Sequence, residues 1–237
     1  MNAANASRLD HLVVLADTLN EGVRWCEKTL GVIPDAGGEH PLMGTHNRLI
    51  NVACAAFPRA YLEIIALDAK AVPTRSAGQQ RWFDMDDPVL LAQVAQHGPQ
   101  LIHWVAAVPD LARAHAAWRT QLGVDRGTLI HASRPTATGL LEWQITVRDD
   151  GQRLMSGCLP TLIQWGDVHP CDSLPPSGVR LDALQLEHPD AQLLRDALDA
   201  AGLPRAHITI EHASTPAIRA TLSTPRGLVT LTTSHAA

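Results

Sequence analysis

The sequence LDHLVV at residues 9–14 returns 92 residues later as LIHWVA at residues 101–106. From these two stretches the chain aligns with itself without a gap as far as the Leu-Gly-Val of residues 30–32 and 122–124. Each copy opens with an apolar run of strand length. It continues with about 12 residues whose apolar positions follow the helical period, and then reaches a glycine suited to a left-handed helix cap. A duplicated strand–helix unit of this kind predicts a fold built from tandem repeats.

Three more strand-like runs follow the helix in each copy, so each copy is predicted to have the order βαβββ. In the first copy these runs span residues 32–35, 46–53 and 60–67. A third and weaker copy follows the second. We therefore expect an α+β fold of tandem βαβββ modules, two well formed and a degenerate third. The predicted boundaries are residues 8–67 for the first module, 68–99 for a connector with a helix over 88–96, 100–167 for the second module and 179–234 for the third.

The composition excludes several classes of protein. Of 237 residues, 46% are hydrophobic and 18% charged, which is too apolar for a disordered chain. The 19 basic and 24 acidic residues give a net charge of −5 without a long run of one sign, so we expect no nucleic-acid or membrane partner. No apolar run reaches the roughly 20 residues of a membrane-spanning helix, and the first residues lack the apolar core of a secretory signal. We expect a cytoplasmic globular protein.

A histidine in the first strand and a carboxylate in the fourth strand of a βαβββ unit give the sequence a family resemblance. Together with LDHLVV, the stretches GTHNRL at residues 44–49 and YLEII at residues 61–65 resemble the vicinal oxygen chelate superfamily, in particular its glyoxalase-like domain proteins. That superfamily includes glyoxalases, bleomycin-resistance proteins and extradiol dioxygenases. The resemblance covers residues 8–167 and implies two modules that pair around a cleft, where a divalent metal can be bound.

The resemblance implies a metal site formed by His11, Glu63 and His103. Gln164 would be a weak fourth ligand, by alignment of residues 60–64 with residues 161–165. Two histidines and one carboxylate suit Zn, Ni, Mn, Fe or Co, and the sequence does not choose among them. The strand period by itself places His11 and Glu63 on the face opposite their apolar neighbours. The alternative is a metal-free pocket or polar cluster in which the same side chains form hydrogen bonds.

The candidate catalytic residues are Glu63 and His46. Gln164 stands where glyoxalase I carries a proton-abstracting carboxylate, and an amide cannot take a proton at neutral pH, so strict glyoxalase I activity is not expected. His46 breaks the repeat and is a candidate acid, base or alternative ligand; the other interpretation is a loop histidine with a local hydrogen bond. The second copy lacks the His-His-Glu set that extradiol dioxygenases gather within one module.

The candidate substrate-binding residues are polar or aromatic and lie close to the expected cleft: Asn47, Arg48, Trp104, Trp143 and Gln164. Arg48 would meet an anionic group of the substrate, or else be a solvated strand residue. The tryptophans would favour a planar or apolar ligand, although core packing is the more common fate of tryptophan in strands.

Several further residues are assigned no function from the sequence. The remaining histidines, His40 and His169 among them, are dispersed and expected at the surface. Gly37 and Gly38 are expected to form a turn between strands. The four cysteines have no C-x-x-C spacing and are expected to be reduced and mostly buried.

Two functions remain open. The first is a metal-dependent enzyme of lyase, isomerase or oxygenase type, in which the metal acts as a Lewis acid on a small oxygenated metabolite bound between the modules. The second is a metal-free protein of the same fold that binds or sequesters a planar small molecule. The modules pair within one chain or are exchanged in a homodimer, and the sequence leaves both arrangements open.

Overall fold

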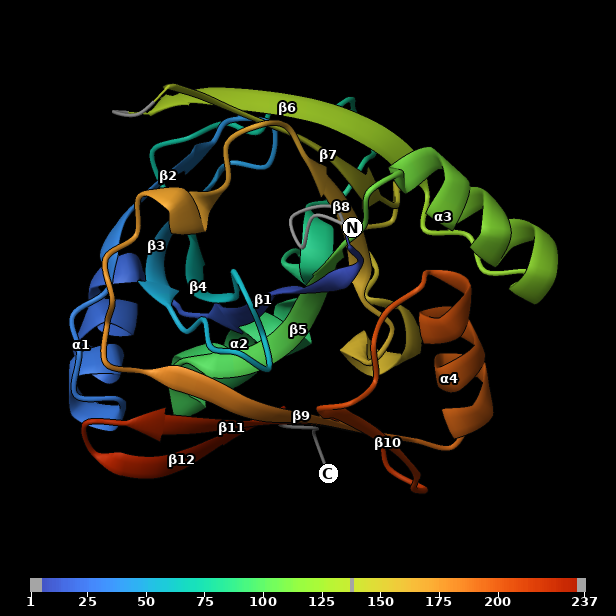
Figure 1. Ribbon diagram of the computed structural model, residues 1–237. Helices are drawn as coiled ribbons and strands as arrows, with labels where there is room; N and C mark the ends of the chain where they lie inside the picture. The colour runs from blue at the N-terminus through green and yellow to red at the C-terminus, as the bar shows by residue number, and fades with distance from the viewer. Residues whose placement is uncertain (1–5, 137–138, 234–237) are drawn as a thin grey trace.

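The computed structural model describes residues 6–136 and 139–233, which form four α-helices and two β-sheets (Figure 1). The large sheet has eight strands in the order β2-β3-β4-β1-β5-β8-β7-β6, and the small sheet has four in the order β10-β9-β11-β12. Both sheets mix parallel and antiparallel pairs, and the large one is curled (Figure 1). The predicted α+β class is confirmed. Residue 234, the predicted end of the third module, lies outside the described residues.

The helices and strands follow the predicted order along the chain. The first copy contains β1 (Arg8–Leu15), α1 (Leu19–Thr29), β2 (Asp35–His40), β3 (Thr45–Asn51) and β4 (Tyr61–Leu67). The second contains β5 (Gln100–Ala107), α3 (Leu111–Ala117), β6 (Thr128–Thr136), β7 (Gly139–Val147) and β8 (Thr161–Trp165). The third contains β9 (Arg180–His188), α4 (Ala191–Ala200), β10 (Ile208–His212), β11 (Ala217–Thr224) and β12 (Gly227–Thr232), and the connector holds α2 (Pro88–His97).

Local signals in the sequence account for the helix boundaries. The Thr18 hydroxyl accepts a hydrogen bond from the backbone N–H of Glu21 at the start of α1, and Asp87 does the same for α2. The predicted glycine caps have left-handed backbones, with φ of 78° at Gly31 and 65° at Gly123. Glycine adopts this conformation without the steric cost that a side chain adds.

The first two copies have the same pairing and together form the large sheet. In each copy the fourth strand lies parallel to the first, β4 beside β1 and β8 beside β5. An antiparallel pair, β1 with β5, joins the copies at the centre of the sheet. The third copy is paired differently, because β10, the strand directly after the helix, lies parallel to β9. Residues 180–232 therefore have the order βαβββ, but their strands pair differently from those of the other two segments, and a third module stays a prediction.

The strand after α1 was expected at residues 32–35 but lies at Asp35–His40, and it includes the two glycines that were expected in a turn. Its pairing with β3 shifts register between Ala36 and Glu39, as at a β-bulge. A Cβ atom at Gly37 would overlap Asn47, and one at Gly38 would overlap the Arg134 side chain. Glycine lets β2 pass close to both residues. Because the two glycines have no side chains, the alternation of apolar and polar residues that marks a strand is missing from this part of the sequence.

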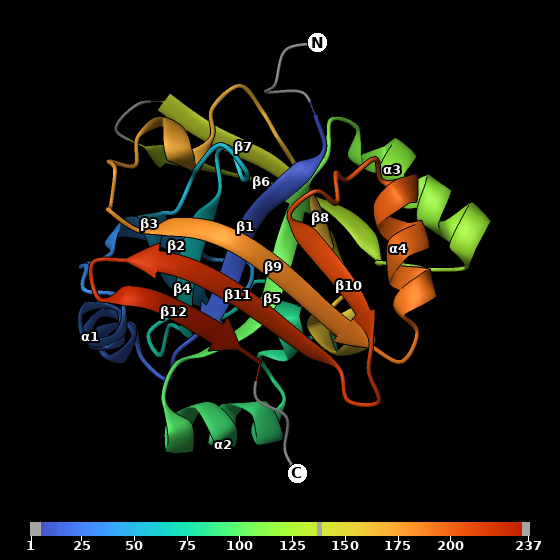
Figure 2. The ribbon, with the colours of Figure 1, turned by 60° about the horizontal axis from the view of Figure 1, so that its bottom comes forward.

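Two hydrophobic clusters cover the two faces of the large sheet. On the outer face, Leu12, Val14, Leu62 and Ile64 pack in a cluster that also includes residues of the helices and of the small sheet, as predicted for the apolar side of β1 and β4. The small sheet contacts the large sheet at β5 (Figure 2). On the inner face, residues such as Val13 pack against Trp82, Phe83 and the connector helix α2. No helix within the described ranges is long and apolar enough to cross a bilayer.

Trp104 was expected to contact substrate, and the structure places it in the outer-face core instead. Its side chain is 0% exposed, and its indole N–H donates to the carbonyl of Cys158 at 2.8 Å. Strand alternation explains the position, because Trp104 points outward between His103 and Val105, which point inward.

We expect Trp104→Ala to lower the free energy of unfolding by about 3–5 kcal/mol, because it removes a fully buried aromatic side chain and leaves a cavity. Urea unfolding followed by circular dichroism measures the change. Val72→Ala is the control, since Val72 is 84% exposed and its truncation should leave the unfolding midpoint unchanged. An equal midpoint for the Trp104 variant would contradict this packing.

Candidate functional site

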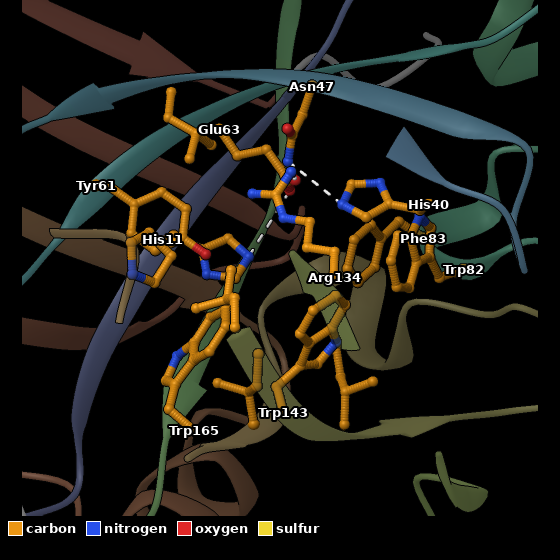
Figure 3. A pocket seen from close by; sticks show the side chains of 15 residues that line it. His11, His40, Asn47, Tyr61, Glu63, Trp82, Phe83, Arg134, Trp143 and Trp165 are labelled. Carbon is orange, nitrogen blue, oxygen red and sulfur yellow. Dashed lines mark hydrogen bonds and ion pairs between the residues drawn. The ribbon is translucent and has the colours of Figure 1, made fainter. Parts of the chain in front are cut away.

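A pocket with one polar and one aromatic wall lies on the inner face of the large sheet (Figure 3). The first copy contributes the polar wall, and β7, β8 and the connector contribute most of the aromatic wall. The cavity itself is narrow, with a volume of about 40 Å³. A groove of about 620 Å³, within the range of small-molecule sites, shares Arg134 with it. The polar or aromatic residues that line it are His11, His40, Asn47, Tyr61, Glu63, Trp82, Phe83, Arg134, Trp143 and Trp165.

Asp10 orients His11 in this pocket. The pairing of β1 with β5 shifts register between Leu9 and His11, and this irregularity brings the neighbouring side chains of Asp10 and His11 together. Nδ1 of His11 lies 2.7 Å from Oδ1 of Asp10. Because the carboxylate can only accept, Nδ1 carries the proton, and in the neutral ring Nε2 keeps its lone pair. Nε2 lies 3.7 Å from Oε2 of Glu63, at the pocket.

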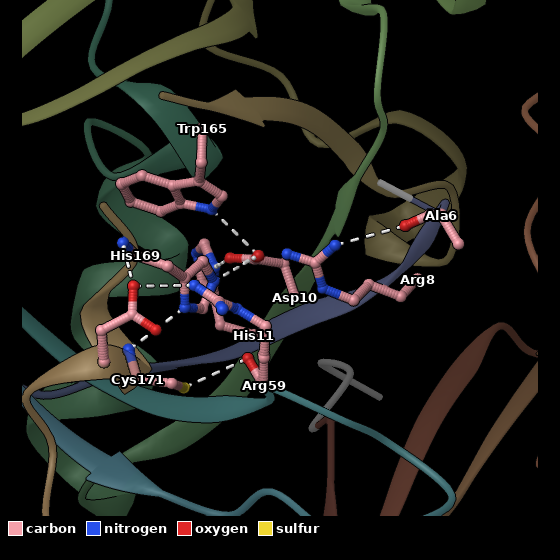
Figure 4. A network of polar contacts seen from close by, with 9 residues as sticks. Ala6, Arg8, Asp10, His11, Arg59, Trp165, His169 and Cys171 are labelled. Carbon is pink, nitrogen blue, oxygen red and sulfur yellow. Dashed lines mark hydrogen bonds and ion pairs between the residues drawn. The ribbon is translucent and has the colours of Figure 1, made fainter. Parts of the chain in front are cut away.

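The Asp10 carboxylate is fully buried and is held by three donors (Figure 4). Besides His11, Oδ2 of Asp10 accepts from the indole N–H of Trp165 at 2.9 Å and lies 3.0 Å from Nε2 of His169. Nδ1 of His169 accepts from the backbone N–H of Cys171, so Nε2 is the donor to Asp10. Burial raises the pKa of Asp10, but the electrostatic attraction of His169 and the hydrogen bonds from both histidines outweigh it and hold the pKa well below its ordinary value.

A chain of hydrogen bonds fixes Glu63 from the other side. The amide N–H of Asn47 donates to Oε1 of Glu63 at 2.6 Å, and Oδ1 of Asn47 accepts from the backbone N–H of Gly38 at 2.7 Å. Nε2 of His40 lies 3.4 Å from the same amide nitrogen, and its Nδ1 lies 3.0 Å from the Thr45 hydroxyl. Burial and the nearby charge of Arg134 lower the pKa of His40 to about 3, so the ring is neutral at pH 7.

Tyr61 stacks on the His11 ring and completes this wall of the pocket. The two ring centroids lie 4.5 Å apart with an angle of 19° between the planes. Burial raises the pKa of the Tyr61 phenol well above its ordinary value, so it stays protonated. The stacked ring fixes the plane of His11 as Asp10 fixes its tautomer.

The equivalent histidine of the second copy, His103, has both ring nitrogens engaged within the protein. Nδ1 lies 3.0 Å from the carbonyl of Gly157, and Nε2 accepts from the backbone N–H of Thr161 at 3.2 Å. The Thr161 hydroxyl, which also accepts from Arg126, lies 3.0 Å from the same Nε2. Burial, reinforced by the charge of Arg126, lowers the pKa of His103 well below its ordinary value. His103 is therefore a neutral histidine whose two ring nitrogens both have partners within the protein. It does not line the pocket.

Strand register explains why the two copies differ. Glu63 lies opposite Val13 of β1, and the residue opposite the corresponding Val105 of β5 is Thr161. Thr161, and not Gln164 as the sequence alignment proposed, therefore occupies the position of Glu63 in the second copy. The Gln164 side chain accepts from the backbone N–H of Leu111 at 2.8 Å, away from His11 and Glu63.

The expected ligand set of His11, Glu63 and His103 is not assembled. Within residues 6–136 and 139–233, no group of three or more His, Cys, Asp or Glu side chains is arranged to hold a metal ion. His11 and Glu63 are neighbours, but the lone pair of His103 that a metal would need already accepts from Thr161. In this arrangement the side chains do not fit the metal that the resemblance implied.

The other expected site residues divide between the pocket and other parts of the fold. Asn47 and Trp143 line the pocket, and the Trp143 ring is tilted by 47° from that of Trp165 with 5.7 Å between the ring centroids. His46 and Arg48 flank Asn47 on β3 and neither lines the pocket, because successive strand residues point to opposite faces.

The sequence analysis missed five residues of this region. Asp10, Tyr61 and Arg134 were given no role, and His40 and His169 were expected at the surface, whereas His169 is 2% exposed. His40 follows the glycine pair of β2, a spacing that could have marked a close approach of the backbone. His169 lies outside any strand or helix pattern, so only the tertiary structure brings it to Asp10.

Comparisons with known proteins support the fold. The glyoxalase-like domain family model matches residues 9–202, which confirms the resemblance. The chain is similar to a hypothetical protein from Staphylococcus aureus, with 13% identity, coverage of 95% of this chain and 84% of that chain, and a TM-score of 0.51, which shows the fold alone. It is also similar to a methylmalonyl-CoA epimerase from Mycobacterium tuberculosis, with 15% identity, coverage of 73% of this chain and 97% of that chain, and a TM-score of 0.40. For the methylmalonyl-CoA epimerase from Streptomyces coelicolor the identity is 16%, the coverage 70% of this chain and 99% of that chain, and the TM-score 0.40. These two similarities carry no argument about the substrate of this chain. No curated protein matches the chain.

We expect Asp10→Asn to destabilise the fold by about 3 kcal/mol at pH 7, because it leaves buried donors without their anionic partner. The folded pKa of Asp10 lies below the unfolded value of about 3.9, so its stabilisation is complete above that value and is lost as the pH falls toward the folded pKa. The difference in unfolding free energy between wild type and variant should therefore shrink from about pH 5 to about pH 3.

Urea unfolding at a series of pH values measures this difference. Asp167→Asn is the matched control, since Asp167 is exposed, and its effect should be small at every pH. A difference for the Asp10 variant that stays constant down to pH 3 would contradict the depressed pKa.

Proposed function

Because the chain belongs to the glyoxalase-like domain family, we propose that it binds a small oxygenated metabolite in the pocket and transfers a proton on it, with His11 as the base. The observation that supports this proposal is the orientation of His11. Asp10 holds the proton on Nδ1, so Nε2 faces the pocket as a proton acceptor. The same arrangement of carboxylate and imidazole orients the base in many acyl-transfer enzymes, although there it serves another reaction.

The proposed step removes a proton from a carbon next to a carbonyl group. His11 Nε2 takes the proton, the electron pair of the C–H bond moves into a carbon–carbon double bond, and the carbonyl oxygen gains the negative charge of an enolate. Return of the proton to the same carbon reverses the step, so no oxidant or leaving group is required. Asp10 at Nδ1 and Glu63 beside Nε2 would stabilise the imidazolium that forms in between.

The remaining pocket residues would bind and orient the ligand. Trp143 and Trp165 offer aromatic surface for a planar part of the molecule. Asn47 fixes one oxygen of Glu63 and leaves Oε2 directed at His11, so Glu63 is a positioning and charge-stabilising residue in this proposal. His46, the catalytic candidate from the sequence, has no part in it, because it does not line the pocket.

The proposed step can be tested by exchange of carbon-bound hydrogen in D₂O. We expect the protein to catalyse exchange in at least one member of a panel of 2-oxo acids, α-hydroxyketones and 1,2-dicarbonyls, followed by proton NMR. His11→Ala should slow this exchange by at least about 100-fold, the usual contribution of a general base. His97→Ala, in an exposed residue at the end of α2, is the control and should exchange at the wild-type rate.

Two results would count against proton transfer. One is equal exchange by wild type and the His11 variant. The other is ligand binding without any exchange across the panel, which would favour the metal-free sequestering protein that the sequence also allowed.

The metal-dependent alternative makes a separate prediction. We expect protein purified without a metal-affinity tag to hold far less than one divalent ion per chain and to gain none on incubation with Zn, Ni, Mn, Fe or Co salts, since His103 is engaged by Thr161. Elemental mass spectrometry after gel filtration measures the content. One ion per chain in wild type that is lost in His103→Ala and in Glu63→Ala would overturn this expectation and restore the metal site implied by the resemblance.

A further inference from the structure

Arg134 places a positive charge at the entrance of the pocket. It extends from β6, at one edge of the large sheet, and lies against Gly38 of β2, at the other edge. Arg134 lines the inner pocket (Figure 3). It also lines a wider groove that includes Pro135, Ser173 and Leu174. Arg134 is one of four residues that line both spaces, so a ligand that spans the groove and the pocket would lie against the guanidinium group.

The Arg134 guanidinium has no anionic partner in the part of the chain that the structure describes. Among residues 6–136 and 139–233, no carboxylate lies within ion-pair distance of Arg134 and its side chain makes no hydrogen bond; its Nε atom is buried without a partner. Glu63, the nearest carboxylate of the pocket wall, is instead bonded to Asn47. A buried donor without a partner is costly, and a ligand that supplies the acceptor would remove that cost.

From this geometry we propose that Arg134 binds a carboxylate group of the ligand, so that the pocket selects planar carboxylic acids. The inference rests on the proposed function, since it names the substrate class of the same pocket. A planar guanidinium donates two parallel hydrogen bonds to a carboxylate. Arg134 is the only lysine or arginine among the described residues that line the pocket. Its single positive charge balances the one negative charge of a carboxylate but not the two negative charges of a phosphate ester.

The position of Arg134 also orients the ligand. The carboxylate end would lie at Arg134, and the planar part would extend along Trp143 and Trp165 toward His11. In this orientation the carbon next to the carbonyl group, which would lose its proton, lies in the same pocket as Nε2 of His11. A 2-oxo acid meets these requirements better than a neutral dicarbonyl.

Benzoate and benzamide form a matched pair of probes, because they share shape and differ in charge. We expect quenching of tryptophan fluorescence to show that wild type binds benzoate at least about 10-fold more tightly than benzamide, as a charge-assisted pair provides. Arg134→Gln should remove this preference by weakening benzoate binding alone. Gly38→Ala should reduce it too, because the added Cβ displaces the guanidinium while the charge is kept.

Arg113→Gln is the control, since Arg113 is exposed on α3, and it should keep the wild-type preference. His11→Ala should also keep the benzoate preference while it loses hydrogen exchange, which separates this inference from the proposed proton transfer. Benzoate binding that is equal in wild type and both Arg134→Gln and Gly38→Ala would overturn the inference. Equal wild-type affinity for the two probes, or no binding of either, would overturn it as well.

Discussion

The buried carboxylate of Asp10 is the interaction on which the geometry of the pocket depends. A charge without solvent is unfavourable unless donors surround it, and here the donors come from three segments: His11 on β1, Trp165 on β8 and His169 in the segment that follows β8. His11 belongs to the first repeat, Trp165 belongs to the second repeat, and His169 follows the second repeat along the chain. One carboxylate thus ties the two halves of the large sheet together and at the same time fixes the tautomer of His11.

The two repeats keep the same backbone arrangement but not the same site. In the first, His11 stands beside Glu63, a carboxylate with one oxygen directed to the pocket. In the second, His103 stands beside Thr161, whose backbone N–H donates to the ring and closes the site. A threonine carries no charge and can satisfy a buried neutral imidazole, so the second site contributes to packing, whereas in the first His11 lines the pocket.

The curl of the large sheet brings its two edges to the entrance of the pocket. Gly37 and Gly38 allow β2 to lie against Asn47 and Arg134, where any side chain would collide. The same backbone supplies the N–H that orients Asn47, which in turn holds Glu63. The glycine pair therefore joins the edge of the sheet to the polar wall of the pocket, although it carries no functional group of its own.

The repeat, the order of strands and helices, the glycine caps and the inward direction of His11 and Glu63 can all be read along the chain. These features depend on hydrophobic period and capping, which act over a few residues and are visible along the chain. The tertiary structure was needed to show that Thr161 and not Gln164 stands opposite Val105 and that both ring nitrogens of His103 are engaged. It also brings His40 and Arg134 to the pocket and His169 to Asp10. These outcomes depend on strand register and on contacts between distant segments, and a shift of register changes which side chains meet without changing the period of the sequence.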